Sequence, residues 1–193
     1  MPRTKEQFEE IRKDKINLIK QVAMELFASE GFVQTPISKI AKAANISKGL
    51  MYNYFESKEE LLKAIVRDGV NEPFESFDRD GDGHLSTEEF EYYVRQSFIQ
   101  TKKNKEFYKL LYTIMLQPNI HDIIIEISND ISTKVLKVAN EYFSTRFDDP
   151  QTELILFSSV MKGLNMQYVF APEYMTDEMV EKAINRIIEN YKK

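Results

Sequence analysis

Residues 35–58 constrain the fold more than any other stretch of this 193-residue chain. The segment opens with Thr35 and Pro36, a pair suited to the N-cap and the first position of a helix. Apolar residues at helical spacing follow, and then comes Asn45, a residue type that tolerates the left-handed conformation of a sharp turn. Ser47 can cap a second helix. The segment therefore predicts two short helices joined by a tight turn, which is helix-turn-helix geometry.

The second of these helices has an unusual surface for its length. It carries one cation, one amide and two phenols interleaved with a glycine, namely Lys48, Gly49, Tyr52, Asn53 and Tyr54. Lysine can meet guanine or phosphate, asparagine can pair with adenine, and tyrosine hydroxyls can bond phosphate. Gly49 would let the start of the helix approach a DNA backbone closely. Helical corners with this spacing also occur in all-α proteins that bind no DNA, so the spacing alone leaves both interpretations open.

A dense and ordered set of residues across the first third of the chain carries a family resemblance. The set comprises Ala23, Leu26, Phe27, Gly31, Phe32, Thr35, Ile37, Ile40, Ala41, Ala44, Ile46, Ser47, Gly49, Tyr52, Tyr54, Phe55, Lys58 and Leu61. In these residues the chain closely resembles the DNA-binding region of TetR-type transcriptional regulators, although Asn45 stands where that family more often has glycine. The DNA-contacting residues expected here are Thr35, Ser47, Lys48, Gly49, Tyr52, Asn53, Tyr54 and Lys58. Of these, Thr35 and Lys58 are expected to lie on phosphates.

The charge distribution agrees with a DNA-binding N-terminal part. Residues 1–69 hold 12 lysine and arginine residues against 10 aspartate and glutamate residues, whereas the remainder holds 14 against 21. Only the first part suits a polyanion, so the C-terminal part should face away from DNA. We predict a DNA-binding domain at residues 1–70 and a helical dimerisation and effector-binding domain at residues 71–193.

The rest of the chain predicts further helices. The expected helices span residues 5–30, 57–70, 86–101, 106–117, 121–147, 151–170 and 176–192. Gly69 and Pro73 predict that the second of these ends or kinks near residue 70. The chain has no cysteine, no apolar run long enough to span a bilayer and no signal peptide at its N-terminus, so we expect a cytoplasmic protein.

Residues 78–89 match the 12-residue loop of an EF-hand. The candidate metal ligands are Asp78, Asp80, Asp82, the His84 carbonyl, Ser86 and Glu89, with Gly83 at the position of the sharp turn. Three carboxylates within five residues repel one another, which favours a bound cation. We expect Ca²⁺ there, with modest affinity because the chain has no second EF-hand to pair with this one, and we expect Mg²⁺ to compete if the site does not reach seven-coordination. The alternative is an acidic turn before the helix that Ser86 caps.

The last two helices carry a candidate dimer interface. A continuous apolar stripe on the final helix contains Met179, Val180, Ala183, Ile184, Ile187, Ile188 and Tyr191, and the preceding helix offers small residues, including Gly163. One interpretation is packing within a single subunit. The resemblance favours the other, a homodimer through residues 151–192, because TetR-type regulators dimerise with a four-helix bundle.

The sequence contains no motif of an enzyme active site, no phosphate loop and no zinc pattern. We therefore expect an all-α regulator of transcription, a repressor released from operator DNA by a small-molecule effector. Aromatic and methionine residues of the middle helices could line the effector pocket, namely Phe107, Tyr108, Tyr112, Met115 and Met161. The alternative function is a calcium-responsive helical binding protein whose helix-turn-helix is only scaffold.

Overall fold

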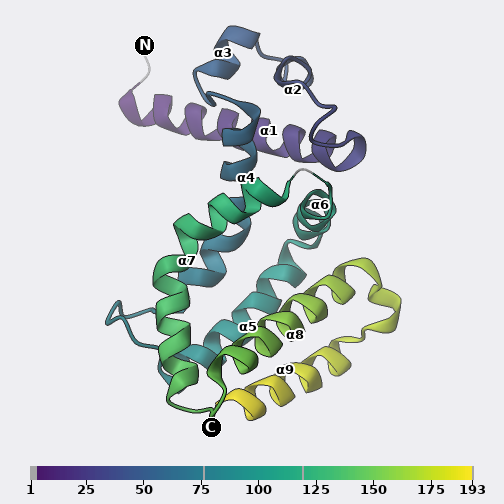
Figure 1. Cartoon of the computed structure of the whole chain (residues 1–193). Helices are drawn as coiled ribbons and strands as arrows, with labels where there is room; N and C mark the ends of the chain where they lie inside the picture. The colour runs from purple at the N-terminus through teal and green to yellow at the C-terminus, as the bar shows by residue number, and fades with distance from the viewer. Residues whose placement is uncertain (1–3, 76, 119, 193) are drawn as a thin grey trace. The chain divides into compact units, whose positions relative to one another are not determined.

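The computed structural model describes residues 4–75, 77–118 and 120–192, and every regular element in these ranges is a helix (Figure 1). The elements are α1 (Lys5–Glu30), α2 (Ile37–Ala43), α3 (Lys48–Tyr52), α4 (Lys58–Glu75), α5 (Thr87–Lys103), α6 (Lys105–Met115), α7 (His121–Ser144), α8 (Pro150–Phe170), the short 3-10 helix η1 (Pro172–Tyr174) and α9 (Asp177–Tyr191). The all-α prediction is confirmed. Helix α4 differs from its predicted length, because it continues through position 73 to Glu75.

The chain forms two compact units. Unit 1 comprises Met1–Asp68 and Leu110–Ile127, and unit 2 comprises Gly69–Lys109 and Ser128–Lys193. The first change of unit lies two residues before the boundary predicted at residue 70. The second unit is not one continuous segment, however, because the end of α6 and the start of α7 belong to unit 1.

Unit 1 is built on α1, whose ends are fixed by its own sequence. Thr4 and Gln7 form a capping box at its start, and Gly31, with a φ of +92°, ends it. The buried apolar side chains of unit 1 as a whole are Ile19, Ala23, Met24, Phe27, Phe32, Ile40, Ala41, Ala44, Met51, Phe55, Leu61, Leu62, Ile65, Val66, Leu111, Ile114 and Ile120. Three of these come from the second segment of the unit, so residues 110–127 are part of its core.

Unit 2 has a core rich in aromatic rings. Phe90 of α5 stacks on Tyr142 of α7 with 5.0 Å between ring centroids, and it also meets Phe157 of α8. Helices α8 and α9 both contact α5 and each other (Figure 1). The α9 residues Val180, Ile184, Ile187, Ile188 and Tyr191 all belong to this core. The apolar stripe of α9 is therefore buried within one subunit, and its interpretation as the dimer interface is wrong for these five residues.

Among the described helices, none combines the length and apolar character that crossing a membrane requires.

Candidate functional site

The helix-turn-helix forms as predicted between α2 and α3. Asn45 adopts a φ of +53° in the turn, the only positive φ at a non-glycine residue within the described ranges. Ser47 caps α3 by accepting a hydrogen bond from the Leu50 N–H at 3.1 Å. Ser57 does the same for α4, through the Glu60 N–H. Local sequence signals thus set both ends of the turn and the start of the following helix.

Helix α3 is shorter than predicted, ending at Tyr52. Asn53 is its C-cap, and Tyr54 lies in the turn that follows, where its N–H still donates to the Met51 carbonyl. The side chains of Lys48, Tyr52 and Asn53 are exposed. These three groups, one cation, one phenol and one amide, are therefore free to meet a partner in solution.

Two cation–π contacts organise the aromatic residues of this surface. The Lys48 ammonium lies 5.9 Å from the centre of the Tyr52 ring, and the Arg12 guanidinium of α1 lies 5.6 Å from that of Tyr54. Arg12 is an exposed cation beside Tyr54 and is not among the DNA-contacting residues expected from the sequence. Both cations are held close to the polar surface of α3.

A shallow hollow of about 440 Å³ lies along the α2–α3 turn. Its lining includes two lysines, Lys42 and Lys48, and two hydroxyls, Ser38 and Ser47. A Cβ added to Gly49 would meet no atom within 4 Å, so the space beside the start of α3 is open. Cations and hydroxyls around an open concave surface suit an anionic partner such as a phosphate backbone.

Thr35 does not occupy its predicted position. Its side chain is 0% exposed, and its Oγ1 donates to the Gly31 carbonyl at 2.8 Å. Pro36 stands at the N-cap of α2, with no side-chain cap hydrogen bond. Thr35 therefore closes the α1–α2 turn from inside, and its hydroxyl cannot reach a phosphate.

Lys58 is also used within unit 1. Its ammonium donates to the carbonyls of Phe32 (2.9 Å) and Val33 (3.2 Å) and lies 4.4 Å from the centre of the Phe32 ring. An ammonium has three donors, so one is left for a phosphate. These contacts connect α4 to the α1–α2 turn, so Lys58 stabilises unit 1 whether or not it also contacts DNA.

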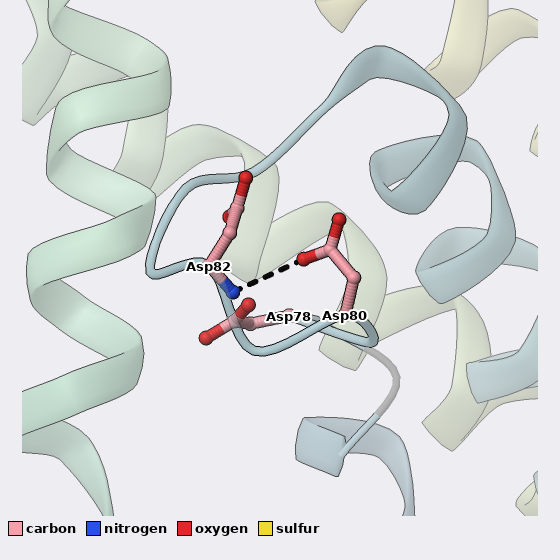
Figure 2. A group of neighbouring side chains, drawn as sticks. All are labelled: Asp78, Asp80 and Asp82. Carbon is pink, nitrogen blue, oxygen red and sulfur yellow. Dashed lines mark hydrogen bonds between the residues drawn. The ribbon is translucent and has the colours of Figure 1, made fainter.

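The acidic loop brings three of its predicted ligands together. Asp78, Asp80 and Asp82 each place a carboxylate oxygen within 4.8 Å of the others, as Figure 2 shows. Gly81 and Gly83 both have positive φ, which lets the loop turn sharply enough to do this. The Asp82 N–H donates to Asp80 Oδ1 at 3.1 Å, and the His84 N–H donates to Asp82 Oδ1 at 2.8 Å. These bonds leave one oxygen of Asp80 and one of Asp82 for another contact.

Glu89 is not part of that group. Its carboxylate accepts from the Arg79 N–H at 2.8 Å and from both the N–H and the hydroxyl of Ser86. Burial acts to raise the pKa of the Glu89 carboxyl, but these hydrogen bonds outweigh it and hold the pKa below its ordinary value. The anionic form is therefore favoured, although Glu89 would have to exchange these partners to become a bidentate metal ligand.

His84 joins the loop to α7. Its Nδ1 lies 2.7 Å from Glu141 Oε1, and both side chains are largely exposed. The ring thus points away from the three aspartates. This arrangement is compatible with the predicted role, in which only the backbone carbonyl of His84 would bind a metal.

The residues predicted for an effector pocket are distributed over both units. Phe107, Tyr108 and Met161 lie in unit 2, where Met161 belongs to the aromatic core. Tyr112 and Met115 lie in unit 1. Tyr112 is partly buried, and this burial raises the pKa of its phenol. The lining of an effector pocket stays a prediction.

An apolar face is exposed on α8. Ile155 is 64% exposed, and Leu156 and Val160 are nearly half exposed. At 3.6 residues per turn these three positions fall on one side of α8, and the buried Phe157 and Met161 fall on the other. The α8 face, as we call Ile155, Leu156 and Val160, is therefore an apolar surface that remains exposed in the subunit, in addition to the single exposed side chains Phe170 of α8 and Met179 of α9.

Residues 19–65 match the family model described as bacterial regulatory proteins, tetR family. The chain is 46% identical over 54 residues to YuxN, an HTH-type transcriptional regulator of Bacillus subtilis, covering 28% of this chain and 19% of YuxN. It is 32% identical over 69 residues to the fatty acid metabolism regulator protein of the same bacterium, covering 36% of each chain. These matches span well under half the length of either relative.

Solved structures extend the likeness of fold to almost the whole chain. The complex of SmeT with triclosan superposes with a TM-score of 0.72 at 19% identity, covering 93% of this chain and 92% of SmeT. The fatty acid degradation regulator FadR from Bacillus halodurans gives a TM-score of 0.67 at 19% identity, covering 89% and 97%. At such identities the likeness establishes the fold, while the N-terminal matches show that residues 19–65 are similar to the segment that the tetR family shares.

Proposed function

We propose that this TetR-type chain is a dimeric transcriptional repressor that binds operator DNA through α2 and α3 and is released by a small-molecule effector. The observation that carries the proposal is the surface of the turn, where Lys48, Tyr52 and Asn53 are exposed beside an open hollow lined with lysines and hydroxyls. Such a surface offers base-reading and phosphate-binding groups together. We propose that the protein is cytoplasmic, because it must reach its operator DNA.

Removing the amide of Asn53 tests base reading. Operator fragments are first selected from genomic DNA with the wild-type protein. We expect Asn53→Ala to weaken binding by about 1–3 kcal/mol and to relax preference at one base pair, because the lost pair of hydrogen bonds served one base. Affinities for single-base variants of the operator provide the measurement.

Lys48→Ala tests whether the Lys48 ammonium contacts a DNA phosphate. If its ammonium lies on a phosphate, affinity should fall for all sequences alike, and the slope of log affinity against log salt should become shallower by about one. Lys137, an exposed lysine of α7 in unit 2, serves as the matched control, and Lys137→Ala should leave the slope unchanged. Wild-type affinity and slope in both Asn53→Ala and Lys48→Ala would overturn the assignment of α3 to DNA.

The α8 face supports the dimer part of the proposal. Three large apolar side chains exposed on one side of a helix form a surface that a second copy of the chain can cover. A Cβ added to Gly163, further along α8, would meet nothing within 4 Å, so a second helix can approach there. The proposed interface thus stays within residues 151–192, but its apolar contacts come from α8.

The names of the relatives favour an apolar effector. One structural neighbour is a complex with triclosan, and two relatives are named as regulators of fatty acid metabolism or degradation. Repression is supported in the same way, since NalD is described as a secondary repressor of an efflux pump. An apolar effector would suit the aromatic and methionine residues predicted for the pocket.

A second proposal concerns the acidic loop, which we infer to bind a hard divalent cation, Ca²⁺ or Mg²⁺. The clustering of the Asp78, Asp80 and Asp82 oxygens supports it, because carboxylates at this separation repel one another without a cation. The site would be structural: coordination would tie the start of α5 to the segment before it and stabilise unit 2. The alternative, a calcium-responsive protein that does not bind operator DNA, predicts calcium binding without operator binding.

Calorimetric titration with calcium and with magnesium tests the loop. We expect the wild type to bind calcium with a dissociation constant of roughly 10⁻⁵ to 10⁻³ M, and saturating calcium to raise its Tm. Glu89→Gln should weaken binding, whereas Glu88→Gln, a change at the exposed neighbour, should not. If neither ion binds the wild type at millimolar concentration, the loop is only an acidic turn.

A further inference from the structure

The α1–α2 turn, which leads directly into the helix-turn-helix, is held by a side chain distant in sequence. Gln117 follows α6 and belongs to the second segment of unit 1. Its Nε2 donates to the Phe27 carbonyl at 2.7 Å, and its Oε1 accepts from the Phe32 N–H at 2.8 Å. One amide therefore joins the last turn of α1 to the residue after Gly31.

Gln117 gives the Phe32 N–H an acceptor and gives the Phe27 carbonyl a second donor. Helix α1 ends at Glu30, so Phe27 is one of the last carbonyls of the helix and Phe32 is the first N–H beyond its cap. The Gly31 N–H also donates to the Phe27 carbonyl, at 3.1 Å. The Gln117 side chain therefore adds to the cap of α1, and it uses both the N–H donor and the oxygen acceptor of its primary amide.

The remaining groups of the turn are also fixed by side chains. Thr35 binds the Gly31 carbonyl, and Lys58 binds the carbonyls of Phe32 and Val33. Gln117 differs from these two because it comes from outside residues 1–68. The Gln117 N–H donates to the Ile114 carbonyl at 3.0 Å, and the Ile114 side chain is fully buried.

We infer that Gln117 is a positioning residue for DNA binding: its amide fixes the α1–α2 turn and so sets the orientation in which α2 and α3 meet the operator. The inference rests on the proposed function. A turn that is fixed before binding does not have to be ordered during binding, so the amide contributes to operator affinity and not only to stability.

Two variants separate the two hydrogen bonds. Gln117→Met keeps the length of the side chain and removes both bonds, and we expect operator affinity to fall about tenfold. Gln117→Glu keeps an acceptor for the Phe32 N–H but loses the donor to the Phe27 carbonyl, so we expect a loss of about threefold. Hydrogen exchange of the Phe32 amide should be faster in Gln117→Met and near the wild-type rate in Gln117→Glu.

Ile65→Val is the control for a purely structural effect. Ile65 lies in the core of the same unit, on α4, and is 1% exposed. Its truncation should lower the Tm without changing operator affinity at temperatures well below the Tm. A positioning role requires the opposite pattern in the Gln117 variants, namely weaker operator binding by protein that is fully folded by circular dichroism.

The outcomes are distinct. Operator affinity within twofold of wild type in Gln117→Met, with faster exchange at Phe32, overturns the inference alone. If Gln117→Met does not fold, Gln117→Glu decides, and wild-type affinity in that variant overturns the inference. A wild-type protein that selects no DNA fragment overturns the proposed function, and the inference with it.

Discussion

Ile155→Glu combined with Val160→Glu is expected to convert the proposed dimer to a folded monomer and to lower operator affinity roughly a hundredfold or more. Both side chains are exposed on α8, so the charges are tolerated in the subunit but would be buried and unpaired in a dimer. A dimer binds two operator half-sites at once, and the monomer loses the effective concentration of the second. Sedimentation velocity and operator titration measure the two effects.

Ile99 on α5 provides the matched control for this double variant. It is 50% exposed in the same unit, so Ile99→Glu adds a charge at a comparable apolar position that is not part of the α8 face. It should leave both the dimer and operator affinity unchanged. A wild type that sediments as a monomer at micromolar concentration, or a double variant that stays dimeric, would show that the α8 face is not the interface.

The helix-turn-helix could be predicted because its signals are local. Asn45 in the turn and Ser47 before α3 each act through backbone groups within three residues, and the structure places both as the sequence indicated. The acidic loop follows the same rule, since its three aspartates and two glycines lie within six consecutive positions. In the helix-turn-helix and in the acidic loop, the local sequence pattern therefore agrees with the local backbone geometry.

Contacts between distant segments could not be predicted in this way. Thr35 has the residue type of an N-cap, but its hydroxyl binds the Gly31 carbonyl because the side chain is enclosed by the core. The sequence predicts Lys58 as a phosphate ligand, but in the structure its ammonium donates to two carbonyls of the α1–α2 turn. Gln117 has no local signal at all, because its partners are 85 and 90 residues away.

The apolar stripe of α9 shows a different limit. An amphipathic helix must bury its apolar side, but periodicity is the same whether the covering surface belongs to the same subunit or to a partner. Within unit 2, α5 and α8 cover α9, and α8 is left with apolar residues on two sides. Whether the apolar side of α9 is buried within the subunit or by a partner depends on which helices pack against it, and this is a matter of tertiary packing that periodicity does not reveal.

Ile184→Asp is therefore expected to unfold unit 2 rather than to separate subunits. Ile184 is 3% exposed in the aromatic core, so an aspartate there is an unpaired charge without water. The cost should reach at least about 4 kcal/mol, a large part of the stability of a typical domain. Urea denaturation followed by circular dichroism measures it, with loss of helical signal expected even without denaturant.

Asn185→Asp is the control, because it adds the same charge one residue further along α9. Asn185 is exposed, and its Oδ1 already accepts from the Arg95 guanidinium at 2.7 Å, so a carboxylate there gains a charged partner. Its stability should stay within about 0.5 kcal/mol of wild type. If Ile184→Asp instead kept the wild-type Tm and became monomeric, α9 would be the dimer interface and the α8 assignment would fall.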